Sequence, residues 1–277
     1  MRNARGGYTV IEVMMVLAVS GALLISAAAV FRGKQGQTQF NQAMRDLDSK
    51  IQSYISDVGA GIFPEAEQYL CQLDSATNRP HLVTGTQVAG SNQDCIFLGK
   101  AIETAVGSNK IAVYTVLGNR TYISGGSSVP VTEFSQSRPE PAIYNGAVLM
   151  DEYKIAFDAA ELVYAMAVGS TIPPGQEKRY EIAGFYNSLQ TQPDPSQQGS
   201  QSLLVKTYRT NPPPAVVTTK QCIEEDVANC RVDTPNKWSL CFKSKSSNDY
   251  ALLVITPTSA GVGTELIFKP DPGVCPG

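Results

Sequence analysis

The sequence predicts an α+β protein in which a long N-terminal α-helix, hydrophobic and then amphipathic, is packed on a β-sheet-rich C-terminal head. Three observations predict this arrangement. An apolar run fills residues 8–31, a helical stripe of apolar side chains continues to residue 58, and strand-like runs separated by turn residues follow from residue 110. Because helices and strands repeat with different periods, each region indicates its own type of element.

The composition limits the function before any motif is considered. The chain has 277 residues, of which 43% are hydrophobic and 17% charged, so it contains enough apolar material for a core. The formal net charge of −3 argues against a protein that coats nucleic acid or binds membranes through a polybasic surface. His81 is the single histidine, and the chain has neither a Gly-x-Ser-x-Gly nor a His-Glu-x-x-His motif, so we expect no enzyme.

The N-terminus carries the clearest signal. Residues 1–7 are basic through Arg2 and Arg5 and end in two glycines. The run 8–31 contains no Lys, Arg, Asp or Pro, and its single acid is Glu12. As a helix it spans roughly 36 Å, enough to cross a bilayer. Positive charge before the run predicts a cytoplasmic N-terminus and a single-pass protein of the cytoplasmic membrane with its head outside.

The sequence offers two cleavage sites, one before this run and one near its end. Residues 26–29 offer a small-residue site of the secretory type, at which cleavage would release a soluble protein. Cleavage after Gly7 would instead keep the apolar helix and make Tyr8 the first residue. Its new α-amine would lie four residues from Glu12 on one helix face, where it can neutralise a carboxylate that is costly in a membrane. A plain membrane anchor that tolerates Glu12 is the remaining interpretation.

The stretch Gly7-Tyr8-Thr9-Val10-Ile11-Glu12, followed by an apolar helix, resembles the N-terminus of type IV pilins and type II secretion pseudopilins. The resemblance implies that prepilin peptidase cuts after Gly7 and methylates the new N-terminus at Tyr8, and that Glu12 is the assembly carboxylate. Tyr8 stands where the family usually has Phe. Gly21 matches a common family glycine, whereas residues 22–29 lack the frequent helix-kinking proline.

The same resemblance implies a pilin-like fold and a structural role. The expected function is that of a minor pilin or pseudopilin in a type IV pilus or a type II secretion-like filament, assembled through the N-terminal helix. Its partners would be prepilin peptidase, the cytoplasmic membrane before assembly, and other pilin or pseudopilin subunits in a filament at the cell surface. The alternative is a membrane-anchored extracellular binding or adhesion protein that does not polymerise.

Three parts are expected along the chain: a leader peptide at 1–7, a spine helix at 8–58 and a globular head at 59–277. Apolar residues at helical spacing mark the second half of the spine, and they are Phe40, Met44, Leu47, Ile51, Ile55 and Val58. Gly59, Gly61 and Pro64 are expected to end the helix. Local unwinding, if any, would fall on Gly21 or on Gly33 and Gly36.

The head is expected to be loop-rich over 65–100 and β from residue 110. The runs 110–117 and 120–124 flank Gly118-Asn119, which predicts a tight hairpin. Other predicted strands lie at 142–150, 161–168, 180–186 and 202–208, and a final antiparallel meander at 238–243, 250–255 and 264–268. The Pro-rich stretch 211–215 either divides the head into a larger and a smaller sheet or joins parts of one continuous sheet.

The cysteines predict disulfides. Six is an even number, all of them lie outside the apolar run, and an exported chain is oxidised. Fifteen pairings are allowed, and proximity along the chain suggests Cys71–Cys95, Cys222–Cys230 and Cys241–Cys275. A metal site is the rival interpretation, which the lack of a Cys-x-x-Cys motif disfavours, so we expect no metal and no cofactor. By the pilin resemblance, the last pair would pin the C-terminal strands.

DNA uptake is a known task of some minor pilins, which makes basic residues of the head candidates for phosphate contacts. Residues 231–277 hold five basic against four acidic side chains, and only Lys243 and Lys245 form a small basic loop that could touch phosphates. This is too little to predict DNA binding, and nothing in the sequence indicates binding to a host surface. Pilus and secretion pseudopilus remain equally open.

Overall fold

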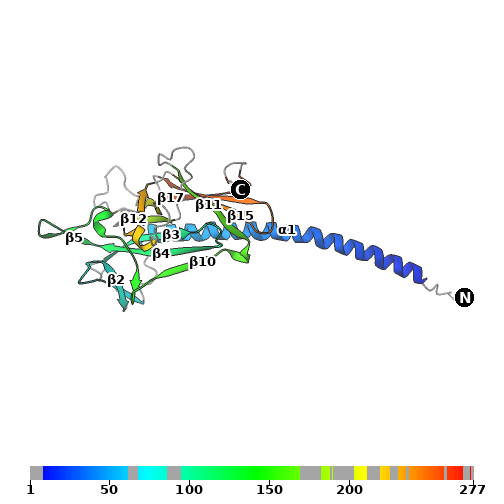
Figure 1. The fold of residues 1–277 in the computed structure, drawn as a ribbon, viewed down its shortest axis with the longest axis horizontal. Coiled ribbons are helices and arrows are strands. Elements are labelled where there is room, and N and C mark those ends of the chain that lie inside the picture. Colours follow the sequence, from blue (N-terminus) through cyan, green and yellow to red (C-terminus); the bar gives the residue numbers. More distant parts are fainter. Residues whose placement is uncertain are drawn as a thin grey trace.

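The computed structural model is an α+β fold in which one long helix carries a β-rich head (Figure 1). It describes residues 9–61, 68–85, 95–168, 182–187, 189, 203–210, 219–224, 230–234, 237–258, 261–270 and 275. The predicted α+β class is therefore confirmed. The expected leader at 1–7 and the Pro-rich stretch 211–215 lie outside the described residues.

Helix α1 runs from Val10 to Gly59, which is 50 residues or roughly 75 Å. Its N-terminal half extends away from the head (Figure 1). At its other end the Ala60 N–H donates to the carbonyl oxygens of Ser56 and Val58, and Gly61 takes a left-handed φ of 66° that turns the chain out of the helix. Gly21, Gly33 and Gly36 all lie within the continuous helical span, so none of them unwinds it.

The largest sheet has seven strands and lies on one side of α1. Six follow the order β10-β4-β3-β12-β13-β14, with β7 paired to β4, and every pairing is antiparallel. Its strands are β3 (Cys95–Thr104), β4 (Lys110–Asn119), β7 (Glu140–Pro141), β10 (Met150–Lys154), β12 (Ile182–Asn187), β13 (Leu203–Thr210) and β14 (Cys230–Asp233).

A second sheet of four strands forms the C-terminal part of the head. Its order is β11-β15-β16-β17, and its strands are β11 (Ala160–Val168), β15 (Lys237–Ser244), β16 (Tyr250–Thr258) and β17 (Gly261–Phe268). The predicted meander of the last three strands is confirmed. Because β11 precedes residues 211–215 and β14 follows them, strands from both sides of that stretch enter both sheets.

Smaller elements complete the head. One four-stranded sheet contains β1 (Tyr69–Leu73), β2 (Pro80–Thr84), β8 (Ile143–Tyr144) and β9 (Ala147–Val148), and a separate hairpin contains β5 (Thr121–Ser124) and β6 (Ser127–Pro130). Three short helices are η1 (Ser135–Ser137), η2 (Ala156–Asp158) and α2 (Thr219–Ile223). The region predicted to be loop-rich, 65–100, thus contains two strands and the start of β3, and the predicted strand at 142–150 is broken by a turn.

The predicted hairpin at Gly118-Asn119 is wrong. Both residues belong to β4 and pair with Ile96 and Cys95 of β3. Gly118 is small for a packing reason, because a Cβ there would lie 2.6 Å from Cδ1 of Leu98. The real hairpin joins β5 to β6, and Gly125-Gly126 form its turn with φ values of 59° and 83°.

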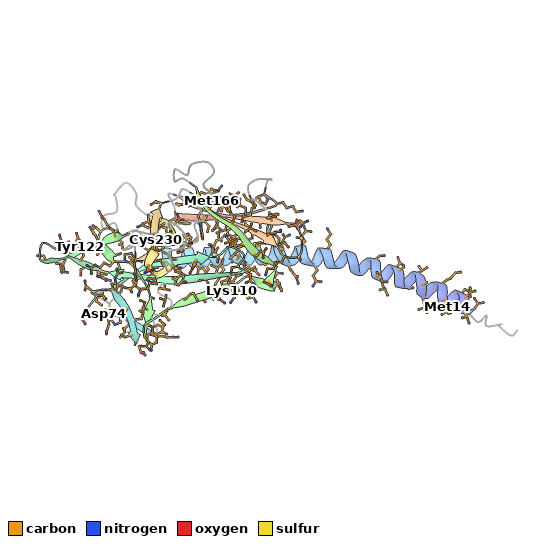
Figure 2. The ribbon with its side chains drawn as sticks, viewed as in Figure 1. Met14, Asp74, Lys110, Tyr122, Met166 and Cys230 are labelled. Atoms are coloured by element: carbon orange, nitrogen blue, oxygen red, sulfur yellow. A yellow bond between two sulfur atoms is a disulfide. The ribbon has the colours of Figure 1, made fainter. Side chains whose placement is uncertain are left out.

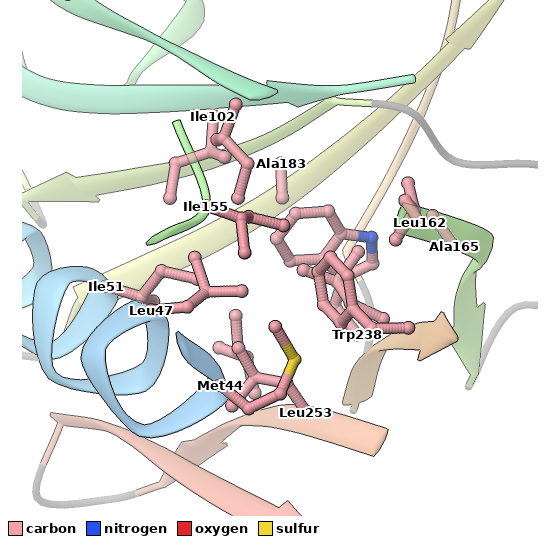
Figure 3. Packing of buried hydrophobic residues seen from close by; sticks show 14 of the residues in the cluster. Met44, Leu47, Ile51, Ile102, Ile155, Leu162, Ala165, Ala183, Trp238 and Leu253 are labelled. Carbon is pink, nitrogen blue, oxygen red and sulfur yellow. The ribbon is translucent and has the colours of Figure 1, made fainter. Parts of the chain in front are cut away.

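The main core lies between α1 and the two larger sheets. The stripe predicted from Phe40 to Val58 is buried, with exposed fractions of 0–7%. Met44, Leu47 and Ile51 face side chains of both sheets, among them Ile102 of β3 and Leu253 of β16 (Figure 3). The C-terminal half of α1 is therefore part of the head, held by the same apolar cluster as the strands.

Candidate functional site

The N-terminal half of α1 is apolar and has nothing packed on it. Val10–Ala27 is long and apolar enough to cross a membrane, and none of it is buried. Eleven of the fifteen exposed large hydrophobic side chains in the described part of the chain lie between Val10 and Ile25. Figure 2 shows Met14 on this bare stretch of helix. At ~1.5–3 kcal/mol for each fully buried side chain, covering the eleven side chains would release roughly 17–33 kcal/mol.

Glu12 begins this segment as the N3 residue of a capping box. Thr9 is the N-cap, and its Oγ1 accepts a hydrogen bond from the Glu12 backbone N–H at 3.3 Å. In return the Glu12 carboxylate accepts hydrogen bonds from the Thr9 backbone N–H at 3.0 Å and from the Thr9 hydroxyl at 3.1 Å. The predicted assembly carboxylate therefore already has two local donors.

Thr9 is a residue that the sequence analysis missed. Its signal was present, since Thr9-Val10-Ile11-Glu12 has the Thr-x-x-Glu spacing of a capping box directly before an apolar run. The predicted cleavage and methylation residues, Gly7 and Tyr8, lie outside the described residues. Of the three predicted N-terminal site residues, Glu12 is therefore the one that the structure describes.

Gly21 and Gly36, two of the glycines of α1, have different surroundings. A Cβ at Gly21 would meet nothing within 4 Å, whereas one at Gly36 would lie 2.6 Å from the Ser246 hydroxyl oxygen. Gly36 thus lies against the turn between β15 and β16. Between Ala27 and Gly36 the chain changes from bare helix to helix covered by the head.

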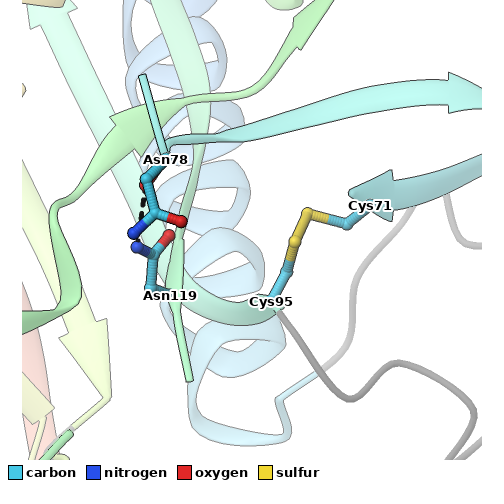
Figure 4. Close-up of a disulfide and its surroundings, with 4 residues drawn as sticks. All are labelled: Cys71, Asn78, Cys95 and Asn119. Carbon is cyan, nitrogen blue, oxygen red and sulfur yellow. Dashed lines mark hydrogen bonds between the residues drawn. A yellow bond between two sulfur atoms is a disulfide. The ribbon is translucent and has the colours of Figure 1, made fainter. Parts of the chain in front are cut away.

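The structure contains three disulfides, and they are the pairs that proximity suggests. Their Cα–Cα distances are 6.0 Å for Cys71–Cys95, 5.4 Å for Cys222–Cys230 and 5.8 Å for Cys241–Cys275, all within the usual range. The first ties β1 to the start of β3 (Figure 4). The second ties α2 to β14, and the third ties β15 to the C-terminal residues. All six cysteines are consumed.

A charged cleft of about 440 Å³ lies between α1 and the large sheet. The Lys100 ammonium is 2.8 Å from an Asp57 carboxylate oxygen and 4.7 Å from the centre of the Tyr54 ring. The Tyr54 hydroxyl donates to Asp151, and its burial, together with that carboxylate, raises its pKa. These side chains satisfy one another, so the cleft stabilises the junction of helix and sheet rather than offering free charge.

A second buried charge joins smaller elements of the head. Glu140 of β7 contacts Lys220 of α2 at 3.1 Å and lies 3.9 Å from Arg79 beside β2. Burial raises the pKa of the Glu140 carboxyl, and Lys220 opposes that shift. The cluster connects α2, β7 and β2, so its role is to hold these elements of the head together.

The two lysines considered for DNA are occupied within the head. Lys245 contacts Asp158 at 2.8 Å, and Lys243 lies 5.9 Å from the ring centre of Tyr250. Asp158 has a lowered pKa because Lys245 and Asn109 donate hydrogen bonds to it, so its carboxylate is ionised at neutral pH. These contacts give the predicted phosphate contact no support.

Groups of three or more His, Cys, Asp or Glu side chains that could hold a metal ion do not occur among the described residues. No family model, no curated protein and no solved structure matches the chain.

Proposed function

We propose that this protein is a structural subunit of a filament of the type IV pilus or type II secretion class, as a minor pilin or pseudopilin. In this proposal prepilin peptidase cleaves after Gly7 and Tyr8 becomes the methylated N-terminus. The protein is inserted in the cytoplasmic membrane with its head outside until it assembles into a filament, in which its N-terminal helix packs against those of other subunits. The head carries disulfides, as an exported domain would.

One observation carries the proposal: a single continuous helix is bare and apolar in one half and part of the head core in the other. The bare half, Val10–Ala27, needs a cover that the head does not supply. Lipid can cover it before assembly, and the equivalent helices of neighbouring subunits can cover it afterwards. Because the other half is fixed in the head from Phe40 onward, a head is positioned by whatever holds the bare helix.

Glu12 gives such a bundle its register. A carboxylate within an apolar bundle is costly unless it is paired, so subunits are favoured at the axial position that brings a cation to Glu12. The free α-amine at Tyr8 is that cation in our proposal. Until the subunit assembles, the two hydrogen bonds from Thr9 reduce the cost of keeping Glu12 in the membrane.

The experiment is to determine the mature N-terminus by mass spectrometry of the protein purified from its native membrane. N-methylated Tyr8 as the first residue supports the proposal. An intact Met1 supports a plain anchor, and a start near residue 30 supports secretion; either contradicts the proposal. A Gly7→Val variant is the matched control, since it should block processing without altering the apolar helix.

A membrane-anchored binding protein that does not polymerise is the second candidate, and the Thr9–Glu12 hydrogen bonds favour it. They satisfy Glu12 within one chain, as a lone anchor requires. Cysteines introduced at exposed helix positions such as Val16 and Leu23 separate the candidates. A filament subunit should form cross-linked ladders in assembled material, whereas an anchor should stay monomeric.

A further inference from the structure

A small pocket lies at the end of the head farthest from the N-terminus, and we call it the distal pocket. It has a volume of about 220 Å³ and lies at the base of the β5–β6 hairpin. Its walls come from the turn before β2, the end of β4, β5 and η1, and include Asn78, Asn119, Tyr122, Gln136 and Arg138. Tyr122 marks this end in Figure 2, opposite Met14 on the bare helix.

Among the described residues, Arg138 is the one charged side chain that lines the distal pocket. Its Nη1 donates only a long hydrogen bond, 3.4 Å, to the carbonyl oxygen of Thr77. Within the described part of the chain no carboxylate forms an ion pair with it. The nearby Asp74 carboxylate is engaged by the backbone N–H groups of Ala76 and Thr77 at 3.0 and 2.7 Å. Arg138 therefore differs from Lys100 in the helix cleft, whose charge is neutralised internally.

The remaining walls are neutral and hold fixed amides. Asn119 is 1% exposed, and its Nδ2 donates to the carbonyl oxygen of Asn78 at 2.9 Å (Figure 4). Gln136 is held by its Oε1, which accepts from Thr132 N at 3.1 Å and Glu133 N at 3.2 Å, so its amide donors are not used in those bonds. Side-chain amides and hydroxyls of this kind pair with hydroxyl groups of a ligand.

Two apolar surfaces complete the pocket. Ile123 also lines it and is 68% exposed, and Tyr122 precedes it on β5. The hairpin that presents them, Thr121–Pro130, contains no charged residue. An aromatic or aliphatic side chain beside amides and a single arginine offers one apolar face, several hydrogen bonds and one positive charge to the same small ligand.

We propose that the distal pocket binds an acidic saccharide, with the carboxylate of one sugar residue held by the Arg138 guanidinium and its hydroxyls by the neighbouring amides. Arginine suits this role because its planar fork matches a carboxylate with two parallel hydrogen bonds. The volume of about 220 Å³ exceeds the roughly 150 Å³ of a cavity that holds one benzene ring, so one sugar ring of the saccharide can enter it. The wall amides and the apolar face of Ile123 suit the hydroxyl groups and the ring face of a sugar, whereas an acidic peptide side chain would engage fewer of these groups.

The inference rests on the proposed function in one respect, namely that the distal pocket faces the surroundings of the cell. If the apolar helix is held in a membrane or a filament core, the opposite end of the head is presented to the surroundings. Binding itself depends on the head alone, so it can be measured whether or not the chain is processed after Gly7.

The test uses the full chain, purified in mild detergent with its disulfides intact, in equilibrium binding to three probes of similar length. These are an oligogalacturonate, a neutral malto-oligosaccharide and an oligoglutamate. We expect the uronate to bind at least tenfold more tightly than either of the others. No uronate binding, or equal affinity for the oligoglutamate, would overturn the proposal.

Two arginine variants then locate the site. Arg138→Gln should weaken uronate binding at least tenfold, while Arg120→Gln should change it by less than twofold, because Arg120 is exposed nearby but does not line the pocket. Equal losses in both variants would show general charge attraction and refute the site. Arg138→Lys, which keeps the charge and loses the fork, should fall between wild type and Arg138→Gln.

A competition assay, in which free sugars displace the bound oligogalacturonate, uses wild-type protein alone and so does not depend on whether a variant folds. Free galacturonate should compete and free galactose should not; displacement by both, or by neither, contradicts a carboxylate-specific pocket. The mature N-terminus is determined in the same preparations. Specific uronate binding by an unprocessed chain would support this inference and leave the proposed filament function without support. A chain that is processed after Gly7 but does not bind uronate would support the filament function and overturn this inference.

Discussion

The ion pair between Lys100 and Asp57 should respond very unequally to loss of either partner. The two side chains are 2.8 Å apart, but Lys100 is only 7% exposed whereas Asp57 is 34% exposed. Asp57→Asn leaves an ammonium group buried without its counter-charge. Lys100→Met leaves a carboxylate that water can reach and fills the space of the lysine stem. We therefore expect Asp57→Asn to be the more destabilising change.

The magnitudes follow from this difference in exposure. Breaking a buried pair by removing one partner costs about 3–5 kcal/mol, and the asparagine oxygen still accepts one hydrogen bond, so ~3 kcal/mol is expected for Asp57→Asn. For Lys100→Met we expect ~1 kcal/mol or less, since buried ion pairs often tolerate apolar replacement. At about 2–4 °C per kcal/mol, the melting temperature should fall by roughly 6–12 °C in the first variant and by up to ~4 °C in the second.

Trp238 is a suitable reporter for this experiment. It is the single tryptophan, it is fully buried, and it belongs to the cluster that holds α1 in the head. Thermal unfolding followed by its fluorescence, in mild detergent with the disulfides intact, gives the melting temperatures. Glu152→Gln is the control, because Glu152 pairs with Lys110 at 2.8 Å but both are about half exposed, so the effect should stay within ~0.5 kcal/mol. Equal melting temperatures for the two cleft variants, or the reverse order, would refute the reasoning.

Three further predictions concern other regions. Glu12→Ala should leave membrane insertion intact but reduce incorporation into filaments, measured by the ratio of sheared to membrane-bound protein; unchanged incorporation would remove the register role. Gly99→Ala should destabilise the head by roughly 3 kcal/mol, because a Cβ there would lie 1.9 Å from the backbone oxygen of Phe185 on β12, and an unaltered melting temperature would contradict this. The Asp74 pKa is lowered from 3.8 mainly by the Thr77 backbone hydrogen bond. Its contribution is therefore present above pH 3.8 and lost as the pH falls through the lower folded value, so Asp74→Asn should flatten the acid side of the stability profile, and an unchanged slope below pH 4 would count against it.

Local patterns predicted those elements whose residues carry their own period. The stripe from Phe40 to Val58 repeats at helical spacing, and each of its members is buried in the structure. The last three predicted strands are separated by turn residues, and in the structure they form the meander β15-β16-β17. Disulfide pairing by proximity also agreed, since each of the three loops closes between elements that are neighbours in the fold.

Features that depend on contacts between distant parts of the chain could not be predicted from local sequence patterns. Gly118-Asn119 has the composition of a turn, yet the requirement at Gly118 is close packing against Leu98, which only the paired strand reveals. Lys100 and Asp57 are 43 residues apart, so their pairing has no local signature. The distal pocket likewise collects residues from four separate segments between Asn78 and Arg138.

The clearest physical conflict in the molecule lies in α1, and its resolution connects the fold to the proposed function. From Phe40 onward the helix is stabilised by the head, so the head requires no help from the N-terminal half. The bare half, in contrast, contributes only exposed apolar area in a single chain, at a cost that grows with every residue left in water. Such a segment is stable only where lipid or other helices cover it. Glu12 makes these two covers unequal in the proposed function: in lipid it has only the groups of its own chain, such as Thr9, whereas a bundle of helices can add a cation from a neighbouring subunit. Under the proposed function, a single carboxylate at the start of the uncharged segment Val10–Ala27 would therefore favour assembly over permanent residence in the membrane.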